Sequence, residues 1–234
     1  MNIYENNPDS DGNRFLSKVY MWMFIGLMLT AVSSYAIMTS TPLLNFFLGS
    51  SAIIFGLLIF QLIIVIILSW AIKSLPPAIA TLIFIFYSVL SGITLTPIFL
   101  SYEIWSLFIV FGITAGMFIC MSLVGYFTKK DLSGVGRFLI MALIGLIIAS
   151  LINMLLYLIL PEMAGMMTFL LSIAGVLIFA GLTAYDTQKI KKIGQSVDHG
   201  APFTQNLAII CALTLYLDFI NLFLYMLRLF GNRR

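Results

Sequence analysis

Long apolar stretches separated by short polar segments fill almost the whole chain. A helix needs about 20 apolar residues to cross the hydrocarbon core of a bilayer, and seven stretches reach that length. They lie at residues 19–39, 51–72, 77–101, 104–127, 138–160, 168–188 and 207–228. The pattern predicts an all-α integral membrane protein with seven transmembrane helices in one domain, residues 19–234, preceded by an N-terminal tail, residues 1–18.

The segments between these stretches are short and polar. The longest, TQKIKKIGQSVDHGAPFTQN at residues 187–206, is expected to be a loop between the sixth and seventh helices. Within the stretches, pairs of small residues offer places where helix backbones can approach closely. The two candidate pairs are Gly112 with Gly116 in GITAG and Ala180 with Ala184 in AGLTA.

The composition excludes a soluble globular fold. Of 234 residues, 62% are hydrophobic and only 9% are charged, and the mean hydropathy is +1.10; about a quarter of the residues are charged in soluble proteins. No basic patch with interleaved aromatic residues lies outside the predicted spans, so nucleic acid is not an expected partner. The single His199 and the lack of a phosphate-binding glycine motif argue against an enzyme, and no cofactor is predicted.

The basic residues are distributed unevenly between the two sides that seven spans define. The N-terminal side carries nine of the twelve, namely Arg14, Lys18, Lys73, Lys129, Lys130, Arg137, Lys189, Lys191 and Lys192. The opposite side carries only Arg228, Arg233 and Arg234. Because basic residues concentrate on the cytoplasmic side of membrane proteins, we expect the N-terminal tail in the cytoplasm and the C-terminus outside.

Two acidic residues lie inside predicted spans, whereas the other seven lie in tails or connections. They are Asp186, near the end of the sixth span, and Asp218, within the seventh. A charged aspartate at the centre of a membrane helix costs roughly 2.5–3.5 kcal/mol even on the most lenient scale, so such residues usually face a bundle interior or water. The two aspartates are therefore the strongest functional candidates in the sequence.

Asp218 lies on a polar stripe along the seventh span. Residues on this stripe recur at spacings of three and four, which places them on one helix face. They are Cys211, Thr214, Asp218, Asn221, Tyr225 and Arg228. Because such a face cannot point into hydrocarbon, we predict a central seventh helix that lines a narrow polar path, with Thr214, Asn221 and Tyr225 as pore-lining candidates.

These segments resemble one family of membrane proteins. The stretches TAYDTQKIK and LTLYLDFINLFLYMLRLFGNRR are similar to those of the Bax inhibitor-1 (transmembrane Bax inhibitor motif) family, particularly its bacterial branch. The similarity extends through LSGITLTPIF and TAGMFICMSLVGYFTKKDLSGVGRF and covers most of the chain from about Val19 onward.

The resemblance implies a specific function. It implies a seven-helix bundle with a central seventh helix that leaks Ca²⁺ across a bacterial inner membrane in a pH-sensitive way. Asp186 and Asp218 would be the pH sensor and gate, and would also contact the passing Ca²⁺. Some members have an arginine on the second helix that latches to this pair; here that helix has none, and Gln61 and Lys73 are the nearest polar candidates.

Two other functions remain open. Intramembrane aspartyl proteases also have two aspartates on neighbouring helices, the first preceded by a tyrosine, as Tyr185 precedes Asp186 here. They use the two carboxyl groups as acid and base. The sequence around Asp218 reads LYLD, however, and lacks the glycines of those enzymes. The other alternative is a regulatory partner of a membrane protease, without transport of its own.

Overall fold

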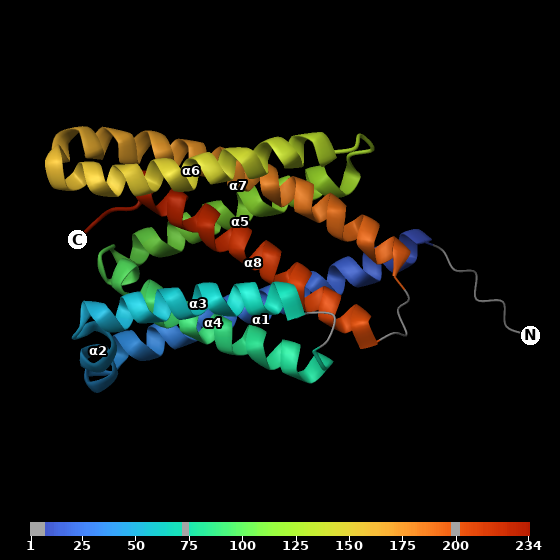
Figure 1. The fold of residues 1–234 in the computed structure, drawn as a ribbon, viewed down its shortest axis with the longest axis horizontal. Coiled ribbons are helices and arrows are strands. Elements are labelled where there is room, and N and C mark those ends of the chain that lie inside the picture. Colours follow the sequence, from blue (N-terminus) through green and yellow to red (C-terminus); the bar gives the residue numbers. More distant parts are fainter. Residues whose placement is uncertain (1–7, 72–74, 198–201) are drawn as a thin grey trace, which may run out of the picture. The chain divides into compact units, whose positions relative to one another are not determined.

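The computed structural model describes residues 8–71, 75–197 and 202–234, and it is helical throughout (Figure 1). The helices are α1 (Pro8–Thr39), α2 (Thr41–Leu48), α3 (Ser51–Ala71), α4 (Pro77–Leu100), α5 (Ile104–Phe127), α6 (Ser133–Ile159), α7 (Pro161–Ser196) and α8 (Pro202–Phe230). Within the described residues, seven helices, all except α2, are long and apolar enough to cross a membrane. The predicted all-α fold with seven spans is therefore confirmed.

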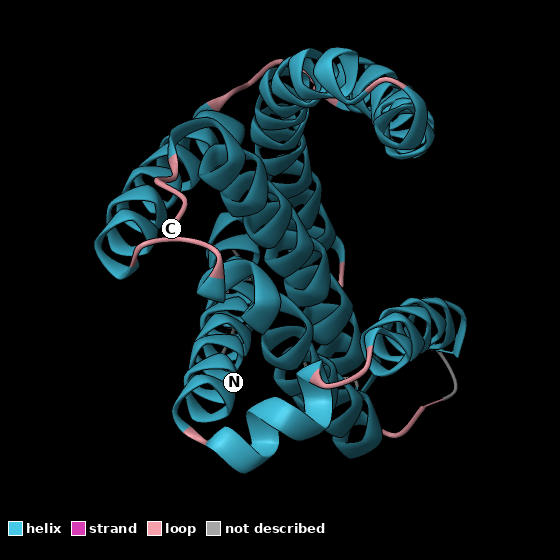
Figure 2. Cartoon of the chain, turned by 90° about the vertical axis from the view of Figure 1, so that its left-hand side faces the viewer, coloured by secondary structure: helices cyan, strands magenta, loops and turns pink. Residues whose placement is uncertain are grey.

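Short loops join the helices, as Figure 2 shows. Several helices begin at a proline, which suits the first turn because its N–H groups have no partner inside the helix. Pro77 opens α4, Pro161 opens α7 and Pro202 opens α8. Among the described residues no strand forms, and the one β-bridge pairs Tyr102 with Arg233.

One expectation about secondary structure is wrong. The segment 187–206 was expected to be a loop, but α7 continues to Ser196 and α8 begins at Pro202. The physical reason is that this segment is amphipathic: Ile190 is buried while Lys189 and Lys192 are exposed. A further side chain at Gly194 would collide with Phe15 of α1. Contacts of the buried face of this segment therefore stabilise a helix that was not expected from its polar sequence.

The short helix α2 was not anticipated either. Its eight residues span only ~12 Å, too little to cross a bilayer, and none of them is buried. The first span is also longer than its apolar stretch, because α1 begins at Pro8 and buries Phe15 and Leu16.

The chain divides into two compact units. One consists of Met1–Ser101 with Ile190–Tyr216, and the other of Tyr102–Lys189 with Leu217–Arg234. In the first unit, the fully buried Tyr216 of α8 packs edge-on against Phe84 and Tyr87 of α4. Its hydroxyl group lies 2.7 Å from the hydroxyl of Thr30, which donates to the carbonyl of Ser88. The second unit contains both intramembrane aspartates.

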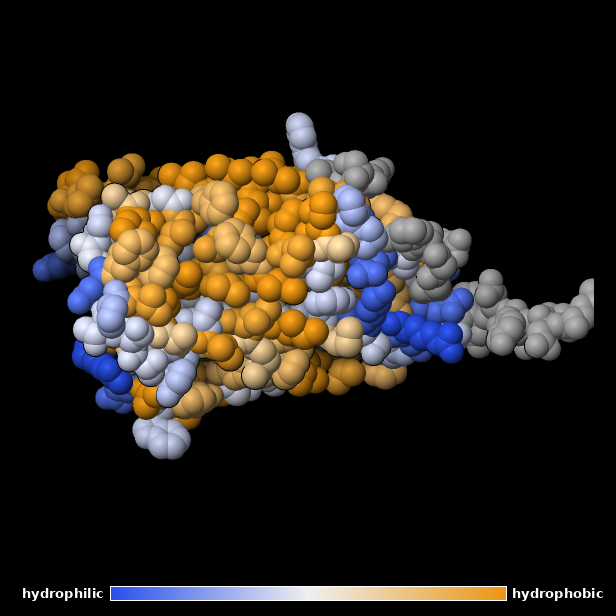
Figure 3. Space-filling model, turned by 90° about the horizontal axis from the view of Figure 1, so that it is seen from below, coloured by the Kyte–Doolittle hydropathy of each residue, from blue (hydrophilic) through white to orange (hydrophobic). Residues whose placement is uncertain are grey.

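The last helix is the most buried of the seven spans. In α8, 61% of the apolar stretch is buried, compared with 11% in α6. The prediction of a central last helix is therefore confirmed. Hydrophobic side chains cover most of the face seen in Figure 3. Many apolar side chains of α6 are also exposed, among them Phe138, Ile144 and Leu151. A surface of this kind is stable only against hydrocarbon.

Candidate functional site

The two intramembrane aspartates are both buried. Asp186 is 8% exposed and lies ten residues before α7 ends at Ser196. Asp218 is 5% exposed and lies sixteen residues after α8 begins at Pro202. At 1.5 Å per residue, these positions are ~15 Å and ~24 Å from the helix ends. The continuation of α7 to Ser196 therefore places Asp186 well inside a helix rather than at its end.

The structure brings the two carboxyl groups together within one unit. The side chains of Asp186 and Asp218 lie within hydrogen-bonding reach of each other. A carboxylate can only accept a hydrogen bond, so a bond between two carboxyl groups requires that one of them carries a proton. Two carboxyl groups in this arrangement can share one proton.

One cation and one unpaired oxygen atom characterise the surroundings of this pair. Lys189, one turn further along α7, is the charged group that acts on Asp186, and its ammonium lies 5.8 Å from the centre of the Tyr185 ring. The Oδ2 atom of Asp218 is buried and has no hydrogen-bond partner. A buried acceptor without a partner is costly and calls for an explanation.

Close helix packing fixes the position of Asp186. A β-carbon at Gly125 of α5 would collide with the backbone carbonyl of Ala184 on α7, and one at Gly136 of α6 would collide with the Tyr185 ring. Both contacts involve the two residues immediately before Asp186. Only glycine lets α5 and α6 approach this part of α7 so closely.

Asp218 is held by aromatic packing on α8. The adjacent Phe219 packs against Phe111 and Phe118 of α5, with both ring-centre distances at 5.4 Å. Such edge-to-face contacts add to the burial of the rings. The same α5 helix therefore supports both aspartates, through Gly125 on one side and the phenylalanines on the other.

Gln188 is a structural residue that the sequence did not reveal. Its side chain accepts a hydrogen bond from the N–H of Leu132 at 2.9 Å, and donates to the carbonyls of Thr128 and Lys130 at 3.1 and 2.8 Å. These three bonds fasten the α5–α6 connection to α7, two residues after Asp186. Its amide occurs in the quoted TAYDTQKIK stretch, but only the fold reveals its partners.

The predicted polar stripe is less uniform than its spacing suggested. The side chains of Thr214 and Asn221 are half-buried and donate to carbonyls of their own helix, those of Ile210 and Leu217. The Tyr225 ring stacks on Phe179 of α7 at 5.9 Å. Thr214 belongs to the first unit, whereas Asn221 and Tyr225 lie with the aspartates in the second. Their role in lining a pore remains a prediction.

Two residues were candidates to replace the arginine that some family members have on the second helix, namely Gln61 and Lys73. Gln61 is buried and donates to Ser91, while its carbonyl oxygen accepts from Thr94. Its hydrogen bonds thus connect α3 with α4. Lys73 lies outside the described residues. In the part of the chain that the structure describes, no three His, Cys, Asp or Glu side chains gather as a metal site.

Comparison with known proteins places this architecture in a family. A family model described as inhibitor of apoptosis-promoting Bax1 matches residues 12–234, nearly the whole chain. The chain belongs to the Bax inhibitor-1 family. As a Bax inhibitor-1 family member with seven candidate spans, it is an integral membrane protein.

Relatives in this family are bacterial and match along almost their full length. The inner membrane protein YbhL of Escherichia coli is 45% identical over 97% of this chain and 95% of its own. A protein of Borreliella burgdorferi is 42% identical over 95% of this chain and 93% of its own. A membrane protein of Streptococcus pyogenes is 38% identical over 94% and 93%, respectively.

Proposed function

We propose that this Bax inhibitor-1 family protein is a pH-sensitive cation leak, with Ca²⁺ as the expected ion and with Asp186 and Asp218 as sensor and gate. The observation that carries this proposal is the contact between two buried carboxyl groups on neighbouring spans. Intramembrane acids are costly and usually mark ion or proton pathways. No cofactor and no catalytic chemistry enter the proposal.

The gate works through one shared proton. While the pair holds that proton, the two carboxyl groups hydrogen-bond and keep α7 against α8, so the path is closed. When the proton leaves, two negative charges face each other in a medium of low dielectric and repel strongly. The helices then separate at this level, and the exposed carboxylates attract a cation.

Calcium fits the oxygen atoms that would become available. Ca²⁺ takes six to eight oxygen ligands, mainly carboxylates, carbonyls and water. Asp186 and Asp218 supply carboxylate oxygens, and Asn221 lies one turn beyond Asp218 with its N–H group already bonded to Leu217, which leaves its carbonyl oxygen to face the ion. Tyr225 is the next polar side chain on this face, and water supplies the remaining ligands.

We place the protein in a bacterial inner membrane. The support is the relative from Escherichia coli, which is named as an inner membrane protein. The uneven distribution of basic residues further supports a cytoplasmic N-terminus and an outer C-terminus.

Calcium flux into liposomes, measured against pH, tests the proposal. Leak by the purified protein should rise with pH through the titration of the pair. Asp186→Asn and Asp218→Asn should each flatten this response, and the double variant should add little, because the two residues act as a unit. Asp131→Asn, in the α5–α6 connection, serves as the control and should keep the wild-type profile. A wild-type pH profile in both single variants would falsify the proposal.

The same carboxyl contact also favours a second candidate, an intramembrane aspartyl protease. In that class, two carboxyl groups share one proton and act as acid and base. Incubating the purified protein with membrane-embedded peptide substrates separates the two functions. Cleavage that Asp218→Asn abolishes would establish the protease, whereas pH-dependent flux without cleavage supports the leak.

A further inference from the structure

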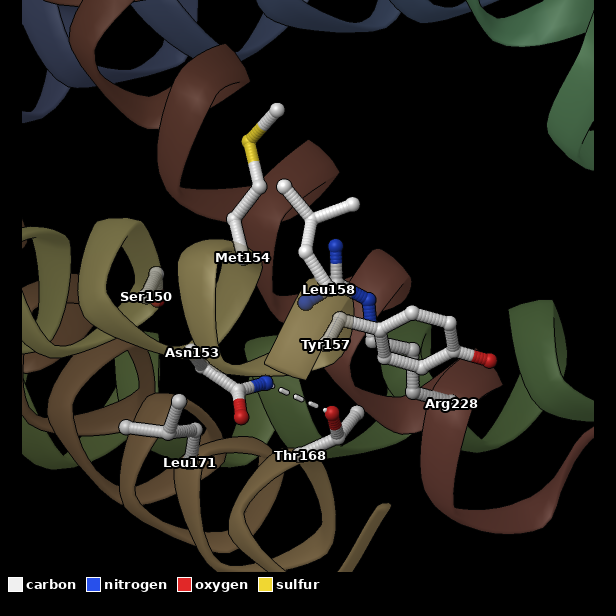
Figure 4. A pocket seen from close by; sticks show the side chains of 8 residues that line it. All are labelled: Ser150, Asn153, Met154, Tyr157, Leu158, Thr168, Leu171 and Arg228. Atoms are coloured by element: carbon white, nitrogen blue, oxygen red, sulfur yellow. Dashed lines mark hydrogen bonds between the residues drawn. The ribbon is translucent and has the colours of Figure 1, made fainter. Parts of the chain in front are cut away.

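A cavity of about 470 Å³ lies at one end of the second unit, between α6, α7 and the end of α8 (Figure 4). Its lining includes Asn153, Tyr157 and Leu158 of α6, Thr168 of α7 and Arg228 of α8. Its volume falls within the range of ~300–1,000 Å³ typical of small-molecule sites. The cavity is separate from the aspartate pair, which does not border it.

The cavity lies at the level of a membrane interface. α6 ends at Ile159 and α8 at Phe230, so Leu158 and Arg228 are within one turn of their helix ends. The start of α5 lies at the same end, because Glu103 and Ser106 are hydrogen-bonded to Asn232, just beyond α8. Trp105 and Tyr157 are both more than 60% exposed there. Exposed tryptophan and tyrosine at helix ends mark the headgroup region.

The cavity opens toward lipid. Met154, Tyr157 and Leu158 on its wall are all more than 60% exposed. They belong to α6, the least buried of the spans. An occupant would therefore enter from the bilayer and lay apolar chain against Met154, Leu158 and Leu171.

The polar end of the cavity calls for an anion. Arg228 stacks its guanidinium over the Tyr225 ring at 5.2 Å, and it has no carboxylate partner among the described residues. The NH₂ group of Asn153 is already engaged, since it donates to Thr168 at 2.8 Å, and Thr168 donates to Ala164. The Oδ1 atom of Asn153 is buried and has no hydrogen-bond partner, so it can accept from a hydroxyl group of a headgroup but does not bind its phosphate. Arg228 is thus the one cation on the cavity wall, and a guanidinium binds phosphate through two parallel hydrogen bonds.

From this geometry we propose that the cavity is a binding site for an anionic phospholipid, whose phosphate pairs with Arg228 and whose acyl chain lies against α6 and α7. A lipid with net negative charge is preferred, because in phosphatidylcholine the phosphate is already offset by its own ammonium group. This inference does not depend on the proposed ion leak.

Native mass spectrometry of the detergent-solubilised full chain tests the site. Phosphatidylglycerol and phosphatidylcholine with identical acyl chains are titrated separately, and phosphatidylglycerol is expected to bind at least fivefold more tightly. Arg228→Gln should abolish this preference, and Arg228→Lys should keep part of it because the charge remains. Arg234→Gln removes a cation at the same end of the chain but outside the cavity, and should change nothing.

Two further measurements separate the possible explanations. Ser150→Phe fills part of the cavity and should weaken phosphatidylglycerol binding several-fold while leaving Arg228 in place. Inorganic phosphate at millimolar concentration should not compete, and competition would mean that the site takes a free anion rather than a lipid. Equal binding of both lipids by the wild type, or equal losses in Arg228→Gln and Arg234→Gln, would overturn the proposal. The thermal unfolding midpoint of each variant establishes that it is folded.

Discussion

At the scale of single residues, a carboxyl group inside the membrane needs a polar partner, and Asp186 and Asp218 are partners of each other. Asp186 and Asp218 stand out in the sequence because a carboxyl group in an apolar run is costly. Their contact was not predictable, because it depends on how α7 and α8 pack. Gln188 was missed for the same reason. A glutamine followed by lysines is ordinary at a helix end, and only the fold reveals its three backbone partners.

Replacing Gln188 should loosen the α5–α6 connection. Gln188→Met keeps the length of the side chain but leaves the carbonyls of Thr128 and Lys130 and the N–H of Leu132 without this partner. Each lost hydrogen bond costs about 0.5–1.5 kcal/mol. We therefore expect trypsin to cleave after Lys129 or Lys130 several-fold faster than in the wild type.

The matched control for this experiment is Gln205→Met, which changes the same residue type on α8. Its cleavage rate at the α5–α6 connection should equal that of the wild type. Unchanged cleavage in Gln188→Met would mean that the connection is held by other contacts.

At the scale of helices, small residues decide which elements touch. The sequence offered two pairs, and the structure distinguishes them. Ala184 contacts Gly125 closely, whereas a β-carbon at Gly112 or Gly116 meets no described atom within 4 Å. The number of spans was predictable because apolar length is a local property. Which small residues face a neighbouring helix is not local, and neither is the amphipathic continuation of α7.

Substitutions at two glycines of α5 should therefore have opposite effects. Gly125→Ala forces its methyl group against the backbone carbonyl of Ala184, which cannot move without shifting α7, and such overpacking costs about 1–3 kcal/mol. Gly112→Ala is the matched control and should be neutral or slightly stabilising, because alanine favours a helix over glycine. Thermal unfolding in detergent measures both, and equal midpoints would contradict the close contact.

The face of α8 that carries Asp218 should be reached by water when the leak is active. A cysteine at Asn221 should react with a small aqueous thiol reagent at high pH and react slowly at low pH. A cysteine at Phe223 should react at neither pH, because this side chain is 5% exposed and packs against Phe111. The background lacks Cys120 and Cys211. Equal labelling at both positions would argue against a single water-facing stripe.

At the scale of the whole molecule, charge and apolar length together define how the chain crosses the membrane. If all seven candidate spans cross, the termini lie on opposite sides, and the excess of lysine and arginine on the N-terminal side leads us to expect that side in the cytoplasm. A reporter enzyme that works only outside the cytoplasm should therefore be active when fused after Arg234. If instead a reporter enzyme that works only in the cytoplasm is active when fused after Arg234, one of the seven helices does not cross the membrane.

The difference in burial between α6 and α8 also determines how freely each helix can change its sequence. Outward side chains of α6 meet only lipid tails, which adapt to any apolar shape, so leucine, isoleucine, valine and phenylalanine are interchangeable there. Most side chains of α8 meet fixed neighbours, so nearly every replacement opens a void or creates a collision. The helix that carries Asp218 is thus the one with the least freedom to drift, and α6 is the one with the most.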